Sequence, residues 1–360
     1  MSPIFVQTVS TFFFTLVLIM VLARLAPRLG LLDTPDGRKQ HRGDIPTVGG
    51  LAIFLSLIVG VMVWDSNAQV ISVRDNNDAL WIFLGSASFL VAMGVLDDKH
   101  DLGVFVRILT EVFVALVVTE ALDLRITKLG DLLGTGQIRL PPPIAYPFTV
   151  IAIFGIVNAF NMLDGMDGLL ACSVLMTLGL FHLFTETSPS QVTLVISSSL
   201  AAFLVSNLEL SPHVPKTFLG DSGSKLLGFI VVCLLLAAAS EQVGKVKTIQ
   251  PVTALFIVGL PLFDMVFTTM RRLMNLHSPL KSDRSHIHHL MQDFGFSSRR
   301  SLLIILSISL FITSLGLTLH RAGLAEQYQL AIFMACFSLY CILVSNAWTI
   351  ARRISQTHKD

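Results

Sequence analysis

The chain has 360 residues, of which 53% are hydrophobic and only 14% are charged, and its formal net charge is +1. Because soluble domains carry about 25% charged residues, this composition excludes an ordinary soluble protein and indicates an integral membrane protein. The near-neutral charge gives no basis for a nucleic-acid partner, and we expect none. The cysteines lie inside apolar runs without a metal-binding spacing and are predicted to be small buried residues: Cys172, Cys233, Cys336 and Cys341.

Eleven apolar segments approach the length of about 20 residues that a membrane-spanning helix requires. In chain order they are residues 4–25, 47–64, 79–96, 105–122, 144–161, 168–185, 191–207, 223–240, 252–270, 301–319 and 328–350. The first has no basic residue before it and no cleavage site after it, so we expect a retained span rather than a signal peptide. These segments predict one all-α polytopic domain over residues 1–360.

The loops between these segments differ in charge. Of the 25 Lys and Arg residues, 18 fall on one side of the predicted bundle and 7 on the other. The positive-inside rule makes the first side cytoplasmic, with the N-terminus outside and the C-terminus inside. The longest outer loop, residues 123–143, is predicted to form a small β-hairpin that ends at Pro141.

The segment from Asn158 to Gly168 places Asp164 and Asp167 directly after a long apolar run. Acidic side chains near a bilayer are costly and usually mark a function. On a helix, residues three apart share one face, where two anions repel each other unless a cation or proton donors intervene. Gly165 would let backbone or a ligand approach closely. A capped turn is the structural alternative.

Four further polar clusters fall on the same predicted cytoplasmic side, so we expect one composite site. They are residues 37–50, 97–101, 207–224 and 278–290. Carboxylates such as Asp97, Asp98 and Asp221 are hard oxygen ligands that suit Mg²⁺ or Mn²⁺, and the neighbouring Lys, Arg and His residues suit a phosphate. Phe218 is placed to stack on a base. Together these groups predict metal-assisted phosphoryl transfer to a lipid.

Each cluster also has a structural alternative. Asp97 and Asp98 could be an ordinary pair at the end of a span, and Asp221 could only cap the helix that follows it. The basic first loop could set topology or contact anionic lipid. The histidines near residue 288 could belong to a solvated loop, and their spacing gives no support for zinc.

Two other acids lie within apolar segments. Glu111 follows Arg107 by four residues, so we predict a helix ion pair between them. Asp264 lies deep in the ninth segment, where we predict a structural, interhelical role.

Four motifs carry a family resemblance. They are Asp97-Asp98-x-x-Asp101, Asn158-Ala-Phe-Asn-Met-Leu-Asp164-Gly-Met-Asp167-Gly, Phe218-Leu-Gly-Asp221-Ser-Gly and His286-Ile-His288-His289. In order and spacing they resemble the polyprenyl-phosphate N-acetylhexosamine-1-phosphate transferases, over about Gly30 to Phe296. The His-Ile-His-His motif, the run that starts at Pro251 and eleven spans resemble the branch that uses UDP-N-acetylglucosamine. The branch that uses UDP-N-acetylmuramoyl-pentapeptide has consecutive histidines and ten spans.

The resemblance implies a reaction in which undecaprenyl phosphate attacks the β-phosphorus of UDP-N-acetylglucosamine and releases UMP. The lipid-diphosphate-linked sugar would start O-antigen or other cell-surface polysaccharide synthesis at the bacterial inner membrane. Direct attack is favoured over an aspartyl-phosphate intermediate. Another UDP-N-acetylhexosamine donor remains an alternative, and a homodimer is allowed. A cation-coupled transporter is a second alternative, although transporters place their sites near the midplane between repeats.

The resemblance also implies roles for individual residues. Asp221 looks like the principal Mg²⁺ ligand, where Mn²⁺ can substitute, and Asp98 lies near the metal. Asp97 looks like the group that deprotonates or orients the lipid phosphate. A lipid phosphate is already largely ionised near neutral pH, so orientation is the stronger expectation.

Substrate contacts are implied for the remaining motif residues. The nucleotide side comprises Asn161, Asp164, Asp167 and Asn207, with Phe218 stacked on uracil. The first loop would meet the diphosphate through Lys39 and His41. The fifth loop would close over the sugar and diphosphate with Arg284, His286, His288 and His289.

Overall fold

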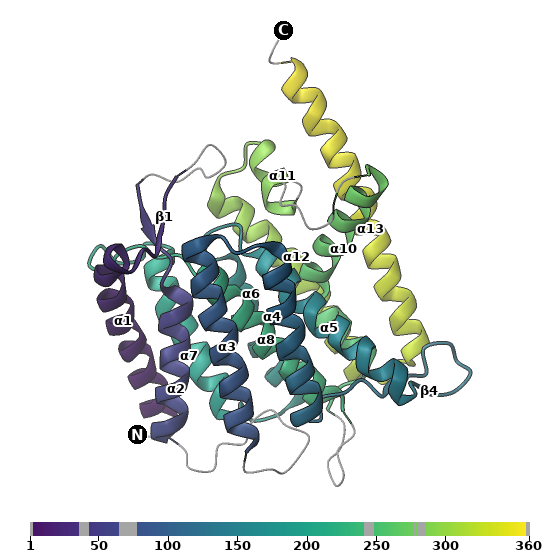
Figure 1. Cartoon of the computed structure of the whole chain (residues 1–360). Coiled ribbons are helices and arrows are strands. Elements are labelled where there is room, and N and C mark those ends of the chain that lie inside the picture. Colours follow the sequence, from purple (N-terminus) through teal and green to yellow (C-terminus); the bar gives the residue numbers. More distant parts are fainter. Residues whose placement is uncertain are drawn as a thin grey trace.

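A computed structural model of the chain describes residues 3–35, 43–64, 78–240, 248–276, 278 and 286–357. Within these ranges the protein is almost entirely helical, with two short antiparallel strand pairs (Figure 1). The elements are α1 (Pro3–Leu29), β1 (Leu32–Asp33), β2 (Ile45–Pro46), α2 (Gly49–Trp64), α3 (Ala79–His100), α4 (Val104–Ala121), β3 (Lys128–Gly130), β4 (Ile138–Arg139), α5 (Pro142–Leu163), α6 (Leu169–Thr185), α7 (Gln191–Asn207), α8 (Gly220–Ala239), α9 (Pro251–Ile257), α10 (Gly259–Met274), α11 (Ile287–Asp293), α12 (Ser298–Arg321) and α13 (Glu326–Thr357).

Every predicted apolar segment coincides with helix, and the membrane character is clear. Six of the described helices are long and apolar enough to cross a membrane, or seven if α9 and α10 form one span. The helices α2, α6 and α7 are shorter, and α4 carries three charged residues, Arg107, Glu111 and Glu120. The eleven-span topology therefore stays a prediction.

The ninth predicted segment is not one straight helix. It is broken at Val258, where α9 and α10 meet at 80°. Pro261 has no N–H to donate to the carbonyl of Ile257, four residues earlier, and this disrupts the helix. The hydroxyl of Thr313 on α12 donates to that carbonyl instead, at 3.4 Å, as buried backbone in a membrane protein requires.

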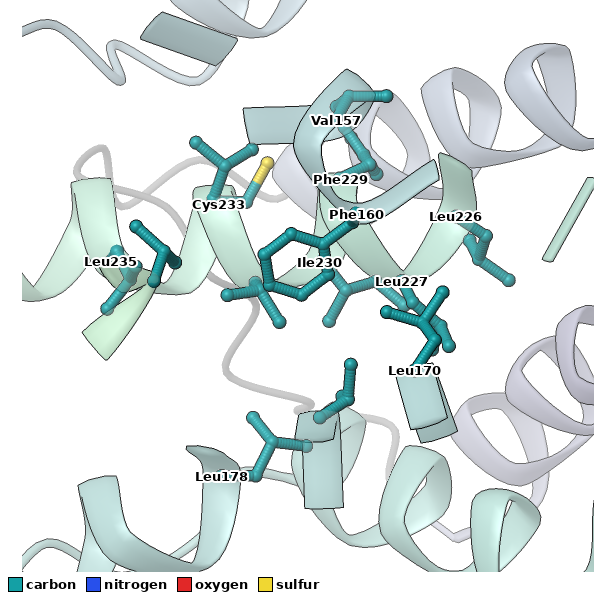
Figure 2. Close-up of a cluster of buried hydrophobic side chains, with 14 of the residues drawn as sticks. Val157, Phe160, Leu170, Leu178, Leu226, Leu227, Phe229, Ile230, Cys233 and Leu235 are labelled. Atoms are coloured by element: carbon teal, nitrogen blue, oxygen red, sulfur yellow. The ribbon is translucent and has the colours of Figure 1, made fainter. Parts of the chain in front are cut away.

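The helix α8 lies at the centre of the bundle, and 89% of its most apolar stretch is buried. It packs against α2, α3 and α5. Figure 2 shows its apolar side chains, including Phe229 and Cys233, among residues of α5 and α6 such as Phe160 and Leu170. A helix that is apolar on all sides is expected to be buried, and the acid at its start is thereby fixed in position.

Two glycines allow close approach of α2 and α3 to the beginning of α8. A Cβ atom on Gly50 would lie 2.2 Å from the backbone nitrogen of Gly223. A Cβ atom on Gly94 would lie 2.4 Å from the Cα atom of Ser222. This contact brings the acidic end of α3 beside Asp221.

The strand pairs lie at opposite ends of the bundle, with β1 toward the end that carries α11 and β4 toward the other end (Figure 1). Strands β1 and β2 pair antiparallel on either side of residues 36–42, which lie outside the described residues. The chain before α8 runs beside β2, because Phe218 N–H donates to the carbonyl of Pro46 at 2.8 Å. Strands β3 and β4 pair Lys128 with Arg139 within the predicted hairpin loop; their placement outside the membrane stays a prediction.

Candidate active site

The last turn of α3 supplies two acids to the site. The Oδ1 atom of Asp98 accepts the backbone N–H of Asp221 at 2.9 Å, so that Asp98 satisfies a free donor at the start of α8. Its Oδ2 atom is buried and has no hydrogen-bond partner among the described residues. A buried carboxylate oxygen without a donor is costly, which makes it available to a cation.

Asp97 is only 5% exposed, and both of its oxygens are engaged. Oδ1 accepts the N–H of Leu102 at 3.0 Å and lies 2.9 Å from Nε of Arg107. Oδ2 lies 3.1 Å from Nζ of Lys225. A carboxylate held by two cations is a poor proton acceptor, so this geometry favours orientation over general-base chemistry for Asp97.

Sequence analysis missed Lys225, a buried residue one turn after Asp221 on α8. Its ammonium lies among three carboxylates, 3.1 Å from Asp97, 3.4 Å from Asp221 and 3.6 Å from Glu111. A lysine within an apolar helix is by itself a functional signal, and its spacing of four from Asp221 places both on one face. Those two signals were readable from the sequence.

The predicted ion pair between Arg107 and Glu111 is wrong. The guanidinium of Arg107 instead contacts Asp97 and Asp101 at the end of α3, the latter at 2.5 Å. Glu111 points towards α8 and accepts a hydrogen bond from the side-chain amide of Asn158 on α5. Contacts between helices outweigh the i,i+4 pairing because the local pair contributes only a few tenths of a kcal/mol.

The Asn158–Gly168 segment forms the end of α5 and the turn into α6. Because α5 ends at Leu163, Asp164 and Asp167 lie on the turn and do not share a helical face, as a continued helix would require. Asn161, on the last turn of α5, accepts the hydroxyl of Ser224 on α8 at 2.6 Å. The turn is therefore attached to the start of α8.

The surroundings of Asp164 disfavour the ionised form of its carboxyl group. Burial, together with the negative charges of Asp221, Asp98 and Asp167, raises the pKa of its carboxyl group to about 8. The carboxyl groups of Asp97 and Asp221 also contact each other, and the ammonium of Lys225 offsets part of their charge. The cluster is thus suited to bind a cation.

The segment before α8, which contains Lys216 and Phe218, lies beside the acidic turn. The ammonium of Lys216 lies 2.6 Å from Asp167, 2.9 Å from Glu209 and 5.9 Å from the ring centre of Phe218. Burial disfavours its charge, but the hydrogen bonds to both acids outweigh this and raise the pKa of Lys216. The ring of Phe218 therefore lies beside the ammonium of Lys216, a group that can bind a phosphate.

Asn207 is 4% exposed and joins this segment to the acidic turn. Its side-chain oxygen accepts the N–H of Gly168 at 2.6 Å, and its amide donates to the carbonyl of Thr217 at 2.9 Å. Asn207 therefore connects the backbone of the turn to the segment before α8, and its predicted support of the nucleotide stays a prediction.

The histidine motif joins the site from α11. His286 is the residue before α11, and its Nδ1 atom lies 2.7 Å from Asp264. His288 lies against the acidic turn, since a Cβ atom on Gly165 would be 2.2 Å from its Nε2 atom. His286 and His288 are 7% and 2% exposed, so the solvated-loop alternative is wrong for both. His289 lies 3.4 Å from the side chain of Gln292.

Asp264 has the interhelical role that was predicted. On α10, it accepts hydrogen bonds from the backbone of Ile287 on α11 at 3.0 Å and from the hydroxyl of Tyr340 on α13 at 2.9 Å. It therefore links three helices to His286. Three predicted substrate contacts, Lys39, His41 and Arg284, lie outside the described residues.

The acids fit a magnesium ion better than a metal held by protein alone. Among the described residues there is no group of three or more His, Cys, Asp or Glu side chains arranged to hold a metal. Mg²⁺ commonly uses one or two carboxylates and completes its shell with water and substrate phosphates. The free Oδ2 atom of Asp98 and the adjacent Asp221 provide such a pair.

An apolar cavity of about 260 Å³ lies elsewhere, between α5, α8, α9 and β3. Its lining includes Phe148, Val232 and Leu255 but none of the acids described above. It is separate from the acidic site.

Comparisons with known proteins identify the family of this chain. Residues 80–239, from α3 through α8, match the family model described as glycosyl transferase family 4. An undecaprenyl-phosphate alpha-N-acetylglucosaminyl 1-phosphate transferase of Yersinia pestis is 32% identical over 356 residues, covering 97% of this chain and 94% of the relative. This chain belongs to the undecaprenyl-phosphate alpha-N-acetylglucosaminyl 1-phosphate transferase family.

Two further members of this transferase family show the same extent of similarity. The Escherichia coli K12 transferase is 32% identical over 356 residues, covering 98% of this chain and 94% of the relative. The Haemophilus influenzae transferase is 33% identical over 348 residues, covering 95% and 94%. The similarity therefore includes the histidine motif and the last two helices, beyond the residues that the family model matches.

Proposed function

We propose that this protein transfers N-acetylglucosamine 1-phosphate from UDP-N-acetylglucosamine to undecaprenyl phosphate and releases UMP. The observation that carries the proposal is the convergence of four motifs on one acidic site. The end of α3, the turn between α5 and α6, the start of α8 and α11 all contribute acids or histidines to it. Members of the transferase family that share almost the whole chain bear this activity in their names.

In the proposed reaction, an oxygen of the lipid phosphate attacks the β-phosphorus of the sugar nucleotide. The bond between that phosphorus and the oxygen bridging to the α-phosphorus breaks, and UMP leaves with the electron pair. Direct attack needs no covalent bond to the protein. The low accessibility of Asp97 and its two cationic partners support a role in orientation rather than in proton transfer.

Asp98 and Asp221 would hold Mg²⁺, or Mn²⁺ in its place. When bound, the ion neutralises charge on the diphosphate. The guanidinium of Arg107 is partly exposed beside Asp97. It can bind a phosphate oxygen while it remains paired with Asp97.

On the nucleotide side, Phe218 would stack on uracil and Asp167 would contact its edge. Lys216 lies between these two side chains and keeps them together. His286, His288 and His289 would close over the sugar and diphosphate, with His288 already in contact with the acidic turn. Lys39, His41 and Arg284 would complete the binding of the diphosphate.

The proposal includes a topology. Eleven spans would place the N-terminus and the β3–β4 pair outside, and the acidic cleft and the C-terminus in the cytoplasm of a bacterium, at its inner membrane. The product would then start O-antigen or another lipid-linked polysaccharide. A homodimer remains a prediction.

An extraction assay tests the reaction and the donor together. The purified protein is supplied with undecaprenyl phosphate, Mg²⁺ and a panel of labelled UDP-sugars, and label in the organic phase is measured. We expect label from UDP-N-acetylglucosamine and equimolar release of UMP. Label only from another UDP-N-acetylhexosamine would replace the donor, and ion flux in proteoliposomes without any lipid-linked product would favour the transporter alternative.

A further inference from the structure

Lys225 is the one described cation that contacts three carboxylates of the acidic centre at once. Its side chain comes from α8 and is 4% exposed. It approaches Asp97 of α3 at 3.1 Å, Asp221 of α8 at 3.4 Å and Glu111 of α4 at 3.6 Å. An ammonium has three N–H donors, so one donor is available for each acid.

Glu111 is the third acid in contact with Lys225, at 3.6 Å. It is 4% exposed, and its Oε2 atom accepts the side-chain amide of Asn158 on α5. Four helices therefore meet through one ammonium and one carboxylate. A buried charge is tolerated only when it is paired and hydrogen-bonded, so Glu111 requires Lys225 as its cation.

The remaining contacts of the aspartates show what this pair holds in place. Asp97 is bound on its other oxygen by Arg107 and by the backbone of Leu102. Asp221 is bound through its backbone N–H to Asp98, whose Oδ2 atom has no hydrogen-bond partner among the described residues. Lys225 thus contacts both Asp97 and the proposed metal ligand Asp221, and helps to fix one side chain relative to the other.

We propose that Lys225 is a positioning residue for the cation-binding carboxylates, and that Glu111 is its additional charge partner. This inference rests on the proposed metal-dependent transfer. Residues in contact with metal ligands orient them, and changing such residues costs about 10- to 100-fold in metal affinity or activity. Lys225 places Asp221 by a fixed positive charge, and Arg107 does the same for Asp97.

The decisive variant is Glu111→Gln combined with Lys225→Met. It removes one negative and one positive charge, so the net charge of the centre is unchanged and any loss of cation affinity reports geometry. With full-length protein in detergent, Mn²⁺ binding is measured from the electron paramagnetic resonance signal of free Mn²⁺. We expect affinity to fall on the order of 10- to 100-fold, with kcat falling in parallel and KM for UDP-N-acetylglucosamine changing less than about threefold.

The single variants and a control separate positioning from folding. Lys225→Met alone should lower Tm by several degrees because it leaves Glu111 without its cation, whereas the double variant should recover most of that loss. Glu111→Gln keeps an oxygen for Asn158 and leaves Lys225 on both aspartates, so Mn²⁺ affinity should stay near wild type. Phe229→Leu, which loses its stacking on Phe83 one turn along α8, should lower Tm without changing Mn²⁺ affinity.

Three results would overturn the inference. The first is wild-type Mn²⁺ affinity and turnover in the double variant. It would mean that Lys225 and Glu111 only neutralise each other and do not position the carboxylates. The second, which serves if the double variant does not fold, is an equal loss of affinity in Glu111→Gln and Lys225→Met. The third is the absence of Mn²⁺ binding by the wild-type protein. These binding measurements need no substrate, so failure of the proposed transfer would be seen separately, as wild-type protein that binds Mn²⁺ but makes no lipid-linked product.

Discussion

At the residue scale, the main feature of the candidate site is an excess of carboxyl groups in a small volume. Asp97, Asp98, Asp164 and Asp221 come from three different elements, and only some of their charge is offset by Arg107 and Lys225. The raised pKa of Asp164 is the measurable consequence. A bound divalent cation would remove much of the repulsion, so cation binding and protonation are linked.

Replacement of Asp164 by Asn should make the cation-free protein less sensitive to alkaline pH. The folded-state pKa of Asp164 is about 8, above its ordinary value of 3.8, so the folded state holds this proton more tightly. Stability is therefore lost as pH rises from about 4 through 8, and Asp164→Asn avoids that loss. In chelator, its Tm should exceed that of the wild type by at least about 2 °C at pH 8.5 and converge with it near pH 4.

Differential scanning fluorimetry across this pH range measures the effect. Excess Mg²⁺ should reduce the difference at pH 8.5, because it neutralises Asp98 and Asp221. Parallel curves of Tm against pH for the two proteins would contradict the raised pKa.

Replacement of Asp221 by Asn should abolish transfer without preventing membrane insertion. Asn keeps the shape of the side chain and the backbone bond to Asp98, but it removes the charge that a divalent cation requires. We expect kcat to fall by at least about 100-fold, since changes outside the ligand shell already cost 10- to 100-fold. Product formation in the extraction assay, at saturating Mg²⁺, measures the loss; near-normal transfer would exclude Asp221 as a metal ligand.

At the element scale, the broken α9–α10 segment connects the histidine motif to the rest of the bundle. The break at Val258 directs α10 away from α9 by 80°. Asp264 on α10 then reaches His286 next to α11 and Tyr340 on α13. A straight span would not present one side chain to both. The break therefore contributes to the site, although it lies outside the acidic cluster.

Two variants of this contact should separate histidine positioning from packing. Asp264→Asn retains an oxygen for Tyr340 but presents an amide to His286, which changes the nitrogen that carries its proton. We expect kcat to fall about 10- to 100-fold, as for other residues that orient a ligand-binding histidine. Tyr340→Phe removes only the bond from α13 and should cost about 1 kcal/mol of stability with nearly wild-type kcat.

Steady-state rates and Tm of both variants, measured in the same detergent, check this expectation. Equal losses of activity in the two variants, each matched by an equal loss of Tm, would show that Asp264 acts only through packing.

At the scale of the whole molecule, the sequence predicts what depends on local composition. Each apolar run is long enough to specify a helix, and acids at the ends of such runs are rare enough to mark Asp97, Asp164 and Asp221 as functional. Contacts between helices are different. The bonds of Lys225 and Arg107 depend on how closely α3 and α4 approach α8, which is set by packing at positions such as Gly94. The break at Val258 had a local signal in Pro261, but its angle depends on the surrounding helices.

Helix length is the physical difficulty for an eleven-span topology. The helices α2 and α7 contain 16 and 17 residues, or about 24–26 Å at 1.5 Å per residue, whereas the hydrocarbon core is about 30 Å thick. Short spans are accommodated by local thinning of the bilayer at a modest cost, and both helices pack against longer neighbours, α7 against α1 and α2 against α8. We therefore expect them to cross, which preserves eleven spans.

Single cysteines in a background without the four native ones test this topology. Thr135→Cys lies in the exposed turn between β3 and β4, and His213→Cys lies in the exposed loop between α7 and α8. Eleven spans place these residues on opposite sides of the membrane. A membrane-impermeant maleimide should label Thr135→Cys in intact spheroplasts and His213→Cys only after lysis. Labelling of both before lysis would mean that an odd number of the helices between the two positions fails to cross, and the short α6 and α7 would be the first to re-examine.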